Sequence, residues 1–373
     1  MSTMQKLLDG AEVEWQHLEK LAKIKHGKDW KGLDSGDIPV YGSGGVMRYV
    51  DTYLYNKPTV LIPRKGSITN IFYIETPFWN VDTIYYTEID TSKVVPKYLY
   101  HFIKTIDLMT LDTGSGRPSL TQAILNKIVV PIPCPENPKK SLEIQAEIVR
   151  ILDAFTELTA ELTAELNARK KQYNYYRDQL LSFDEGEVEW RTIGELAENL
   201  DSMRKPVTSG LREAGEIPYY GASGIVDYVK DYIFDGDFLL VSEDGANLLA
   251  RSTPIAFSIS GKSWVNNHAH ILKFKTYAER RYVEYYLNSI DLTPYISGAA
   301  QPKLNQKNLN GIKIPNPSPE EKARIVTILD KFDALTNSIT EGLPREIELR
   351  QTQYEYYRDL LLSFPKPDSE ATD

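Results

Sequence analysis

The chain has 373 residues, a hydrophobic fraction of 42% and a net charge of −9. Its single cysteine, Cys134, excludes an internal disulfide bond and favours a reducing compartment, so we expect a cytoplasmic protein. No apolar run approaches the roughly 18 residues of a membrane helix, and a signal-peptide pattern is missing, so we expect no association with a membrane. The acidic net charge argues against binding nucleic acid by bulk charge alone. The length predicts two domains with connecting helices.

Residues 12–140 predict a first mixed α/β domain, preceded by a short segment, 1–11. Short runs rich in Val, Ile, Tyr and Thr, bounded by Gly, Pro, Asn and Asp, predict strands. These strands are expected at 59–62, 71–74 and 83–87. Large apolar residues at helical spacing then predict a helix over 97–106, and a loop rich in Gly and Pro follows at 114–118.

Residues 141–186 predict a long helix. Its apolar residues recur three or four positions apart, which places them on one face that requires a partner helix. Between Thr156 and Leu166 the sequence TEL-TAEL-TAEL repeats every four residues. Four residues turn an α-helix by about 400°, so these leucines stay on one side. Ser141, and later Ser318, are predicted to cap helix N-termini because acidic residues follow them.

The second half of the chain duplicates the first. Gln353–Phe364 (QYEYYRDLLLSF) repeats Gln172–Phe183 (QYNYYRDQLLSF) 181 residues later, with two differences. Further matched pairs are Trp15/Trp190, Tyr41/Tyr220, Trp79/Trp264, Pro118/Pro302 and Phe155/Phe332. An offset of domain size identifies a tandem duplication rather than a solenoid repeat.

The duplication predicts a second mixed α/β domain over 187–316 and a second helical region over 317–364, with a disordered acidic tail, 365–373. The corresponding elements are strands at 238–242, 254–259 and 269–274 and a helix over 279–290. Gly342-Leu343-Pro344 should break the second helical region. Segment 1–11 resembles the end of the central helix and completes a circular repeat, so the termini are expected to lie close together.

The helical regions are nearly identical between the copies, whereas the mixed α/β regions have diverged. This indicates a shared scaffold carrying two different recognition domains; simple drift of loops is the alternative. Residues 12–140 carry a charge of +2 and residues 187–316 a charge of −2, while the helical regions are acidic. Domains so close to neutral would need specifically placed contacts and a basic partner to bind DNA.

The order of these features resembles the specificity (S) subunits of type I restriction–modification enzymes, in the subgroup with TAEL-type spacer repeats. The resemblance covers essentially the whole chain. It is carried by the duplicated QYxYYRDxLLSF, by IVRILDAFTELTAELTAEL against IVTILDKFDALTNSIT, by GSGRPSLTQ against SGAAQPKLNQ, and by WVNNHAHIL at 264–272.

The resemblance implies an α+β fold, with two mixed α/β target-recognition domains joined by two long antiparallel coiled-coil helical regions in a pseudo-twofold circular organisation. It implies a non-catalytic subunit in which each domain reads one half of a split DNA site and the helices set the spacer. The expected partners are double-stranded DNA, two modification (methyltransferase) subunits and restriction subunits. No cofactor is expected on this chain; S-adenosylmethionine, ATP and Mg²⁺ are expected on the partner subunits.

Candidate DNA contacts are polar residues of the variable loops. Arg suits guanine and Asn or Gln suits adenine, whereas Lys and Ser more often contact phosphate. In the first domain they are Tyr41, Ser43, Arg48, Arg64, Lys65, Ser67, Asn70, Arg117 and Ser119. In the second they are Tyr220, Ser223, Asn247, Arg251, Asn266, Asn267, Gln301 and Lys303. A solvated or structural role is the alternative for each of them.

The apolar helix faces are the candidate partner-binding surface. Its residues are Phe155, Leu158, Leu162, Tyr175, Tyr176, Phe332, Leu335, Ile339, Tyr356 and Tyr357. The repeated tyrosine pair would also suit base stacking, but as a duplicated helical motif it is better interpreted as a packing or partner contact.

His268 and His270 share one face of a predicted strand, but no further Cys or His ligand follows nearby, so we predict no metal site. The GxxxxGK[ST], GxSxG and HExxH motifs and the signatures of an adenine methyltransferase are missing from the sequence, which argues against a catalytic enzyme. The remaining alternative is a helical scaffold whose two domains bind protein rather than DNA.

Overall fold

The computed structural model describes residues 12–112, 118–184, 186–298 and 301–364. Within them the chain forms two compact units, one built from 12–163 and 346–364 and the other from 164–345. Each unit combines one mixed α/β domain with helical segments from both copies of the repeat. This is the circular organisation that the duplication predicts. Segments 1–11 and 365–373, and with them the expected closeness of the termini, lie outside the described residues.

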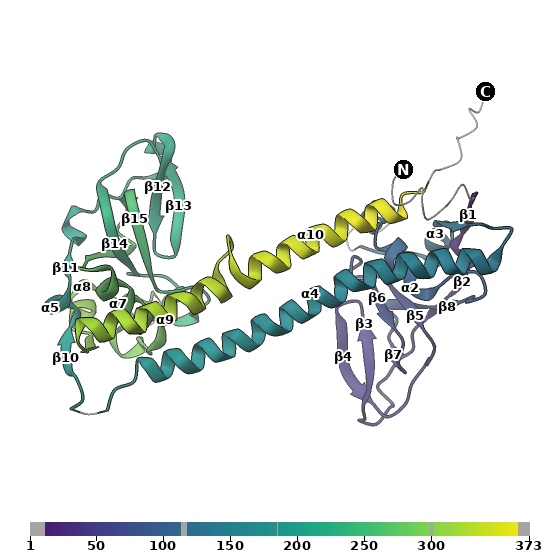
Figure 1. Ribbon diagram of the computed structural model, residues 1–373, viewed down its shortest axis with the longest axis horizontal. Coiled ribbons are helices and arrows are strands. Elements are labelled where there is room, and N and C mark those ends of the chain that lie inside the picture. Colours follow the sequence, from purple (N-terminus) through teal and green to yellow (C-terminus); the bar gives the residue numbers. More distant parts are fainter. Residues whose placement is uncertain (1–11, 113–117, 185, 299–300, 365–373) are drawn as a thin grey trace. The chain divides into compact units, whose positions relative to one another are not determined.

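The first unit contains three sheets, seen among the purple and blue strands of Figure 1. A two-stranded ribbon pairs β1 (Val13–His17) with β9 (Val129–Pro133). The other sheets have the orders β2 (Ala22–His26), β8 (Ile84–Ile89), β5 (Thr59–Pro63), β6 (Phe72–Ile74), and β4 (Gly45–Val50), β3 (Ile38–Gly42), β7 (Trp79–Asn80). Its short helices are α2 (Pro96–Ile103) and α3 (Gln122–Asn126), with 3₁₀ turns at Leu18–Lys20 and Leu108–Leu111.

The second unit has the same plan with two sheets. The ribbon pairs β10 (Glu189–Thr192) with β17 (Lys313–Asn316). The six-stranded sheet has the order β11 (Glu198–Asn199), β16 (Ala269–Lys273), β14 (Phe234–Ser242), β15 (Ala256–Val265), β12 (Ala214–Gly221), β13 (Gly224–Val229). The short helices are α5 (Ile193–Leu196), α6 (Asn247–Ala250), α7 (Tyr277–Ser289) and α8 (Gln306–Asn310), with 3₁₀ turns at Asp201–Met203, Ser209–Leu211 and Thr293–Tyr295.

The two units have similar strand orders but differ at one strand. In the second unit, β15 pairs with both β14 and β12 and joins all six strands into one sheet. In the first unit two short strands take its place, with β6 pairing with β5 and β7 with β3. Pro77 lies between β6 and β7, and proline has no N–H to donate to a strand ladder. The strands of the first unit thus form separate sheets of four and three strands, and Pro77 lies at the gap between them.

The predicted elements are present, with ends shifted by a few residues. The six predicted strands coincide with β5, β6, β8, β14, β15 and β16, and the two predicted domain helices with α2 and α7. Ser318 caps α9 (Pro319–Asn337), since its side chain accepts from the Glu321 N–H at 3.2 Å. The prediction for Ser141 is wrong. The central helix α4 (Pro138–Leu180) begins before it, and the Asn137 Oδ1 accepts from the Lys140 N–H at 3.1 Å instead.

The two helical regions differ in continuity. Helix α4 runs for 43 residues without a break, whereas the second region is divided into α9 and α10 (Gly342–Leu362), as Figure 1 shows. The predicted break is present at Gly342, whose φ is 77°. A Cβ at this position would lie 2.3 Å from the Ala334 carbonyl oxygen, so the turn requires glycine.

Each unit has an apolar core that both copies of the repeat complete. In the first core, Ile148 and Leu152 of α4 pack with Leu361, Leu362 and Phe364 from the end of the chain. In the second core, the equivalent residues are Leu181 and, packed against it, Leu180 and Phe183. Full burial of such a side chain contributes about 1.5–3 kcal/mol. The duplicated LLSF segment thus closes the core of the domain encoded by the other copy, which accounts for its preservation.

Candidate nucleic-acid interface

The loop after β5 in the first unit is fixed by its backbone. The N–H groups of Arg64 and Lys65 donate to the Thr83 carbonyl at 2.9 and 3.3 Å, and the Gly66 N–H donates to the Pro118 carbonyl at 3.3 Å. Gly66 has a φ of 88°, in the left-handed region that glycine favours. With the backbone groups paired inside the protein, the side chains of Arg64 and Lys65 extend to the surface. We call residues 64–67, with 118 and 119, the first reader loops.

A carboxylate holds the two cations of the first reader loops. Lys65 Nζ lies 2.7 Å and Arg64 Nη1 3.8 Å from Asp82 Oδ2. The hydrogen bond from Lys65 holds the pKa of the Asp82 carboxyl below its usual range. These side chains are well exposed, so the ion pairs contribute little to stability. Arg64 and Lys65 can therefore leave Asp82 for a more negative ligand.

Other first-domain candidates brace these loops or lie beside them. The Asn70 Nδ2 donates to the Ser43 carbonyl at 3.0 Å, and the half-buried Tyr41 ring packs against aromatic rings of the sheet. The Arg48 guanidinium lies 4.2 Å from the Trp30 ring centroid. Ser67 is exposed, whereas Ser119 is half-buried and its N–H donates to Asp112 at 2.7 Å. Arg117 lies outside the described residues.

The second unit places a loop on the same backbone plan. The Glu243 N–H donates to the His268 carbonyl at 2.9 Å, the Gly245 N–H to the Pro302 carbonyl at 3.3 Å, and the Leu304 N–H to the Glu243 carbonyl at 2.8 Å. Gly245 repeats the positive φ of Gly66, at 103°. Residues 243–246, with 302 and 303, are the second reader loops. They carry Glu243 and Asp244 where the first reader loops carry Arg64 and Lys65.

A buried ionic network supports the second reader loops. His270 is fully buried; its Nδ1 lies 2.6 Å from Asp201 Oδ2 and its Nε2 2.6 Å from the Leu304 carbonyl oxygen. Both ring nitrogens therefore lie at hydrogen-bond distance from an acceptor oxygen. Burial alone would raise the pKa values of Asp201 and Glu243, but His270 and Arg204 hold both below their usual range. Arg204 Nη1 lies 2.6 Å from Glu243 Oε2.

Asp201, Glu243 and His270 are also the kind of group that can hold a metal ion, with ligand atoms within 4.8 Å of one another. Two cations already occupy their oxygens, Arg204 at 2.6 Å and Lys303 at 3.0 Å from Glu243. A metal ion would have to displace them, so the cluster fits an ion-pair network better than a metal site. Spacing along the sequence could not reveal this cluster, because Asp201 and His270 are 69 residues apart.

Three second-domain candidates bond to the protein's own backbone. Asn266 is 6% exposed, and its Oδ1 accepts from the His268 N–H at 2.8 Å. Asn247 hydrogen-bonds to the backbone of Thr253, and Arg251 Nη2 donates to the Ile290 carbonyl. These side chains hold the protein's own loops in this structure, and their role as DNA contacts stays a prediction. Among the others, Tyr220 is half-buried, whereas Ser223, Asn267, Gln301 and Lys303 are exposed.

The aromatic residues of the helices divide into packed and exposed groups. Phe155 stacks on Tyr357 with ring centroids 5.1 Å apart, and Phe332 stacks on Tyr176 at 5.7 Å. Leu158, Leu162 and Leu335 are half-buried, whereas Tyr175, Tyr356 and Ile339 are 62%, 63% and 79% exposed. Phe155 and Phe332 therefore pack helices within this chain. Substituting them would test that packing before it tested a partner contact, and Tyr175 and Tyr356 are better probes.

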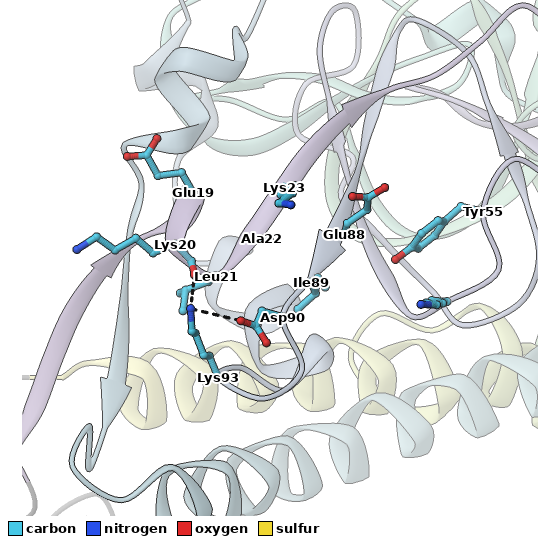
Figure 2. Close-up of a pocket in the computed structure, with 11 residues that line it drawn as sticks. Glu19, Lys20, Leu21, Ala22, Lys23, Tyr55, Glu88, Ile89, Asp90 and Lys93 are labelled. Atoms are coloured by element: carbon cyan, nitrogen blue, oxygen red, sulfur yellow. Dashed lines mark hydrogen bonds and ion pairs between the residues drawn. The ribbon is translucent and has the colours of Figure 1, made fainter.

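A cleft of about 630 Å³ opens beside β2 in the first unit (Figure 2). Its walls carry lysines and carboxylates side by side, and the Lys93 ammonium lies 3.3 Å from Asp90 Oδ2 and 3.2 Å from the Lys20 carbonyl oxygen. Such mutually compensating charges are typical of a solvated surface rather than of a substrate site.

Comparisons with known proteins agree with this arrangement of two equivalent loop systems. The family model described as the type I restriction modification DNA specificity domain matches twice, at residues 12–170 and 185–349. The chain therefore belongs to the type I restriction–modification specificity-subunit family.

Two relatives from Escherichia coli illustrate the similarity. The chain is 40% identical to the EcoR124I/EcoR124II specificity subunit, over 99% of this chain and 98% of that one. It is 34% identical to the EcoprrI specificity subunit, over 91% and 92%. The crystal structure of the S subunit from M. genitalium superimposes with a TM-score of 0.64 at 16% identity, covering 96% and 98% of the two chains. That structural match supports the α+β fold. Across the described residues, every helix is too short or too polar to cross a membrane.

Proposed function

We propose that this chain is the non-catalytic DNA-recognition subunit of a type I restriction–modification complex, and that each domain recognises one half of a bipartite, asymmetric DNA site. The observation that carries the proposal is the pair of reader loops, held by the same backbone hydrogen bonds but equipped with different side chains. A shared backbone with unlike side chains suits two readers that dock alike and recognise different bases. This arrangement does not favour the alternative function of a protein-binding scaffold.

The same proposal assigns the helices to assembly. The exposed Tyr175 and Tyr356 occupy equivalent positions in the two copies, which suits one modification subunit at each. Large exposed aromatic side chains at a repeated position mark an interaction site. Restriction subunits join this core, and S-adenosylmethionine, ATP and Mg²⁺ belong to the partner subunits. Native mass spectrometry of Tyr175→Ala with the modification subunit should show a one-to-one complex where the unmodified chain gives two to one.

Methylation mapping tests the recognition proposal. The chain is expressed in cells with its modification subunit, and adenine-methylated sites are sequenced. We expect one split motif that depends on this chain. Arg64→Ala should weaken discrimination within one half-site by about 1–3 kcal/mol and leave the other half-site unchanged. Arg191→Ala, which removes an exposed arginine of the β10 ribbon, is the matched control. Equal losses at both half-sites would refute independent readers.

The helix α4 is proposed to set the distance between the half-sites. An additional Thr-Ala-Glu-Leu after Leu166 keeps the apolar face nearly in phase and lengthens the helix by ~6 Å. Because only one helical region lengthens, we expect the unread spacer to grow by about one base pair, ~3.4 Å. Insertion of three residues would rotate the apolar face by ~60° and impair assembly. An unchanged spacer after the four-residue insertion would contradict this role.

A further inference from the structure

The first and second reader loops have the same backbone arrangement but carry side chains of opposite charge. Lys65 and Asp244 occupy the same position, because each forms an isolated β-bridge with the residue that follows a matched proline, Lys65 with Ser119 and Asp244 with Lys303. Each is followed by a glycine of positive φ whose N–H donates to a proline carbonyl at 3.3 Å. The first domain thus presents a donor, and the second presents an acceptor, at one place in the fold.

The carboxylate of Asp244 is oriented at the surface rather than buried. Its side chain is 33% exposed, and His268 Nδ1 lies 2.9 Å from Oδ2 and 3.0 Å from Oδ1. Lys303 beside it extends to Glu243 at 3.0 Å. The imidazole therefore gives the carboxylate a preferred direction, and the carboxylate oxygens have further lone pairs that can accept hydrogen bonds.

The chemistry of DNA restricts what an exposed carboxylate can do at a reader surface. The phosphate backbone repels a carboxylate, so an acidic side chain that contacts DNA belongs at a base edge. In the major groove the amino groups of cytosine (N4) and adenine (N6) are the donors, whereas guanine and thymine present acceptors. A carboxylate accepts from the former and repels the latter.

We propose that Asp244, oriented by His268, reads an exocyclic amino group in the major groove of the second half-site, while Lys65 reads an acceptor-bearing base at the equivalent position of the first. The inference rests on the proposed DNA-recognition function and adds a specificity-determining residue to it. His268 is a positioning residue, and Lys303 neutralises the acidic surface and reaches phosphate. The second half-site therefore has adenine or cytosine where the first has guanine or thymine.

Methylation mapping with the intact modification complex tests this assignment. Asp244→Ala should relax one position of the second half-site, with discrimination between amino and keto bases falling on the order of 10- to 100-fold. The first half-site and the spacer should stay unchanged. Asp244→Asn separates the two amino bases, because an asparagine pairs well with adenine and poorly with cytosine. Lys65→Gln is the matched variant and should relax the equivalent position of the first half-site.

The positioning role of His268 has its own outcome. His268→Gln should partly relax the position that Asp244→Ala relaxes and no other, a result that general destabilisation would not produce. Lys303→Gln should lower methylation at all sites alike and reduce the salt dependence of DNA binding, without changing the motif. If Asp244→Ala leaves the second half-site unchanged while the unmodified chain still specifies a split motif, the assignment fails and the recognition function stands. If the unmodified chain specifies no motif, the recognition function itself fails.

Discussion

The first and second units place different chemistry at one buried position below the reader loops. In the first unit, the Tyr85 hydroxyl donates to the Leu120 carbonyl at 3.3 Å. In the second unit, His270 occupies this place, and its Nε2 donates to the Leu304 carbonyl at 2.6 Å. The tyrosine has no charged partner in this hydrogen bond, whereas the imidazole is linked through Asp201 to the ion pairs of Arg204. The same fold thus supports its reader loops either with a neutral hydrogen bond or with an ionic network.

The helical contacts repeat more closely than the loops do. Asp153 of α4 pairs with Lys97 at 2.8 Å and His101 at 3.2 Å, and its counterpart Asp330 of α9 pairs with Arg281 at 2.9 Å and accepts from the Tyr285 hydroxyl at 2.7 Å. Each aspartate has two partners on the neighbouring helix. The positions of these partners are the same in both copies, but the residue types differ. The scaffold therefore preserves geometry where the two copies must pack alike.

Removing the buried carboxylate of Asp201 should give the largest effect. Asp201→Ala leaves the Arg204 guanidinium and the buried His270 ring without this partner, and should lower the free energy of unfolding of the second unit by about 3–5 kcal/mol. Tyr85→Phe removes one neutral hydrogen bond in the first unit and should cost about 0.5–1.5 kcal/mol. Hydrogen exchange, followed separately in the two units, measures both. Similar losses in the two variants would show that the network is not ionic.

The break between α9 and α10 distinguishes the second helical region from the continuous α4. Its substitution should give the next largest effect. Gly342→Ala forces a Cβ against the Ala334 carbonyl oxygen in a left-handed conformation, and should cost about 1–3 kcal/mol. Gly210→Ala, where an added Cβ meets no atom within 4 Å, is the control. Urea denaturation compares the two variants. A neutral Gly342→Ala would mean that the second region can run as continuously as α4.

The smallest expected effect is a pH dependence of the first unit that His101 causes. Burial lowers the pKa of His101 despite the opposing Asp153, and Lys97 and Lys104 act in the same direction as burial. A lowered folded-state pKa means that the neutral ring is favoured. The contribution of the neutral His101 ring to the stability of the first unit is therefore complete above about pH 6.5, the ordinary pKa of histidine. It is lost as the pH falls through the folded-state pKa. Tyr285 stands at this position in the second unit and does not titrate there. Hydrogen exchange between pH 7 and pH 5.5 should show the first unit weakening first, and His101→Gln should remove the difference.

Local patterns predicted the elements well because alternation, helical spacing and turn residues are encoded within a few positions. The register of the repeat, the strands, and the break at Gly342 all follow from such patterns. The division of the first sheet falls at Pro77, and the sequence alone does not mark this position because the division is recognised only by comparison with the continuous β15. The expected cap at Ser141 failed because Asn137, four residues earlier, competes for the same helix end.

The candidate site was harder to predict because the residue type does not reveal whether a side chain points to the solvent or into the protein. Arg64, Lys65 and Ser67 lie at the surface as expected, but Asn266 and Arg251 turn into the protein to hold its own backbone. The network around His270 joins residues from three distant segments, which spacing along the chain cannot show. An alignment of the two copies would have revealed one more signal, because Arg64-Lys65 aligns with Glu243-Asp244.

The antiparallel ribbons have a consequence for how such a chain can change. Each recognition domain begins and ends in one ribbon, with Val13 opposite Pro133 in the first and Glu189 opposite Asn316 in the second. Paired strands lie about 4.8 Å apart, so the entry and exit of a domain are immediate neighbours. This is the geometry of an inserted cassette. A foreign domain could be exchanged at these two points if it has the same ribbon and a matching face for the helix residues that complete its core, such as Leu152 and Leu361.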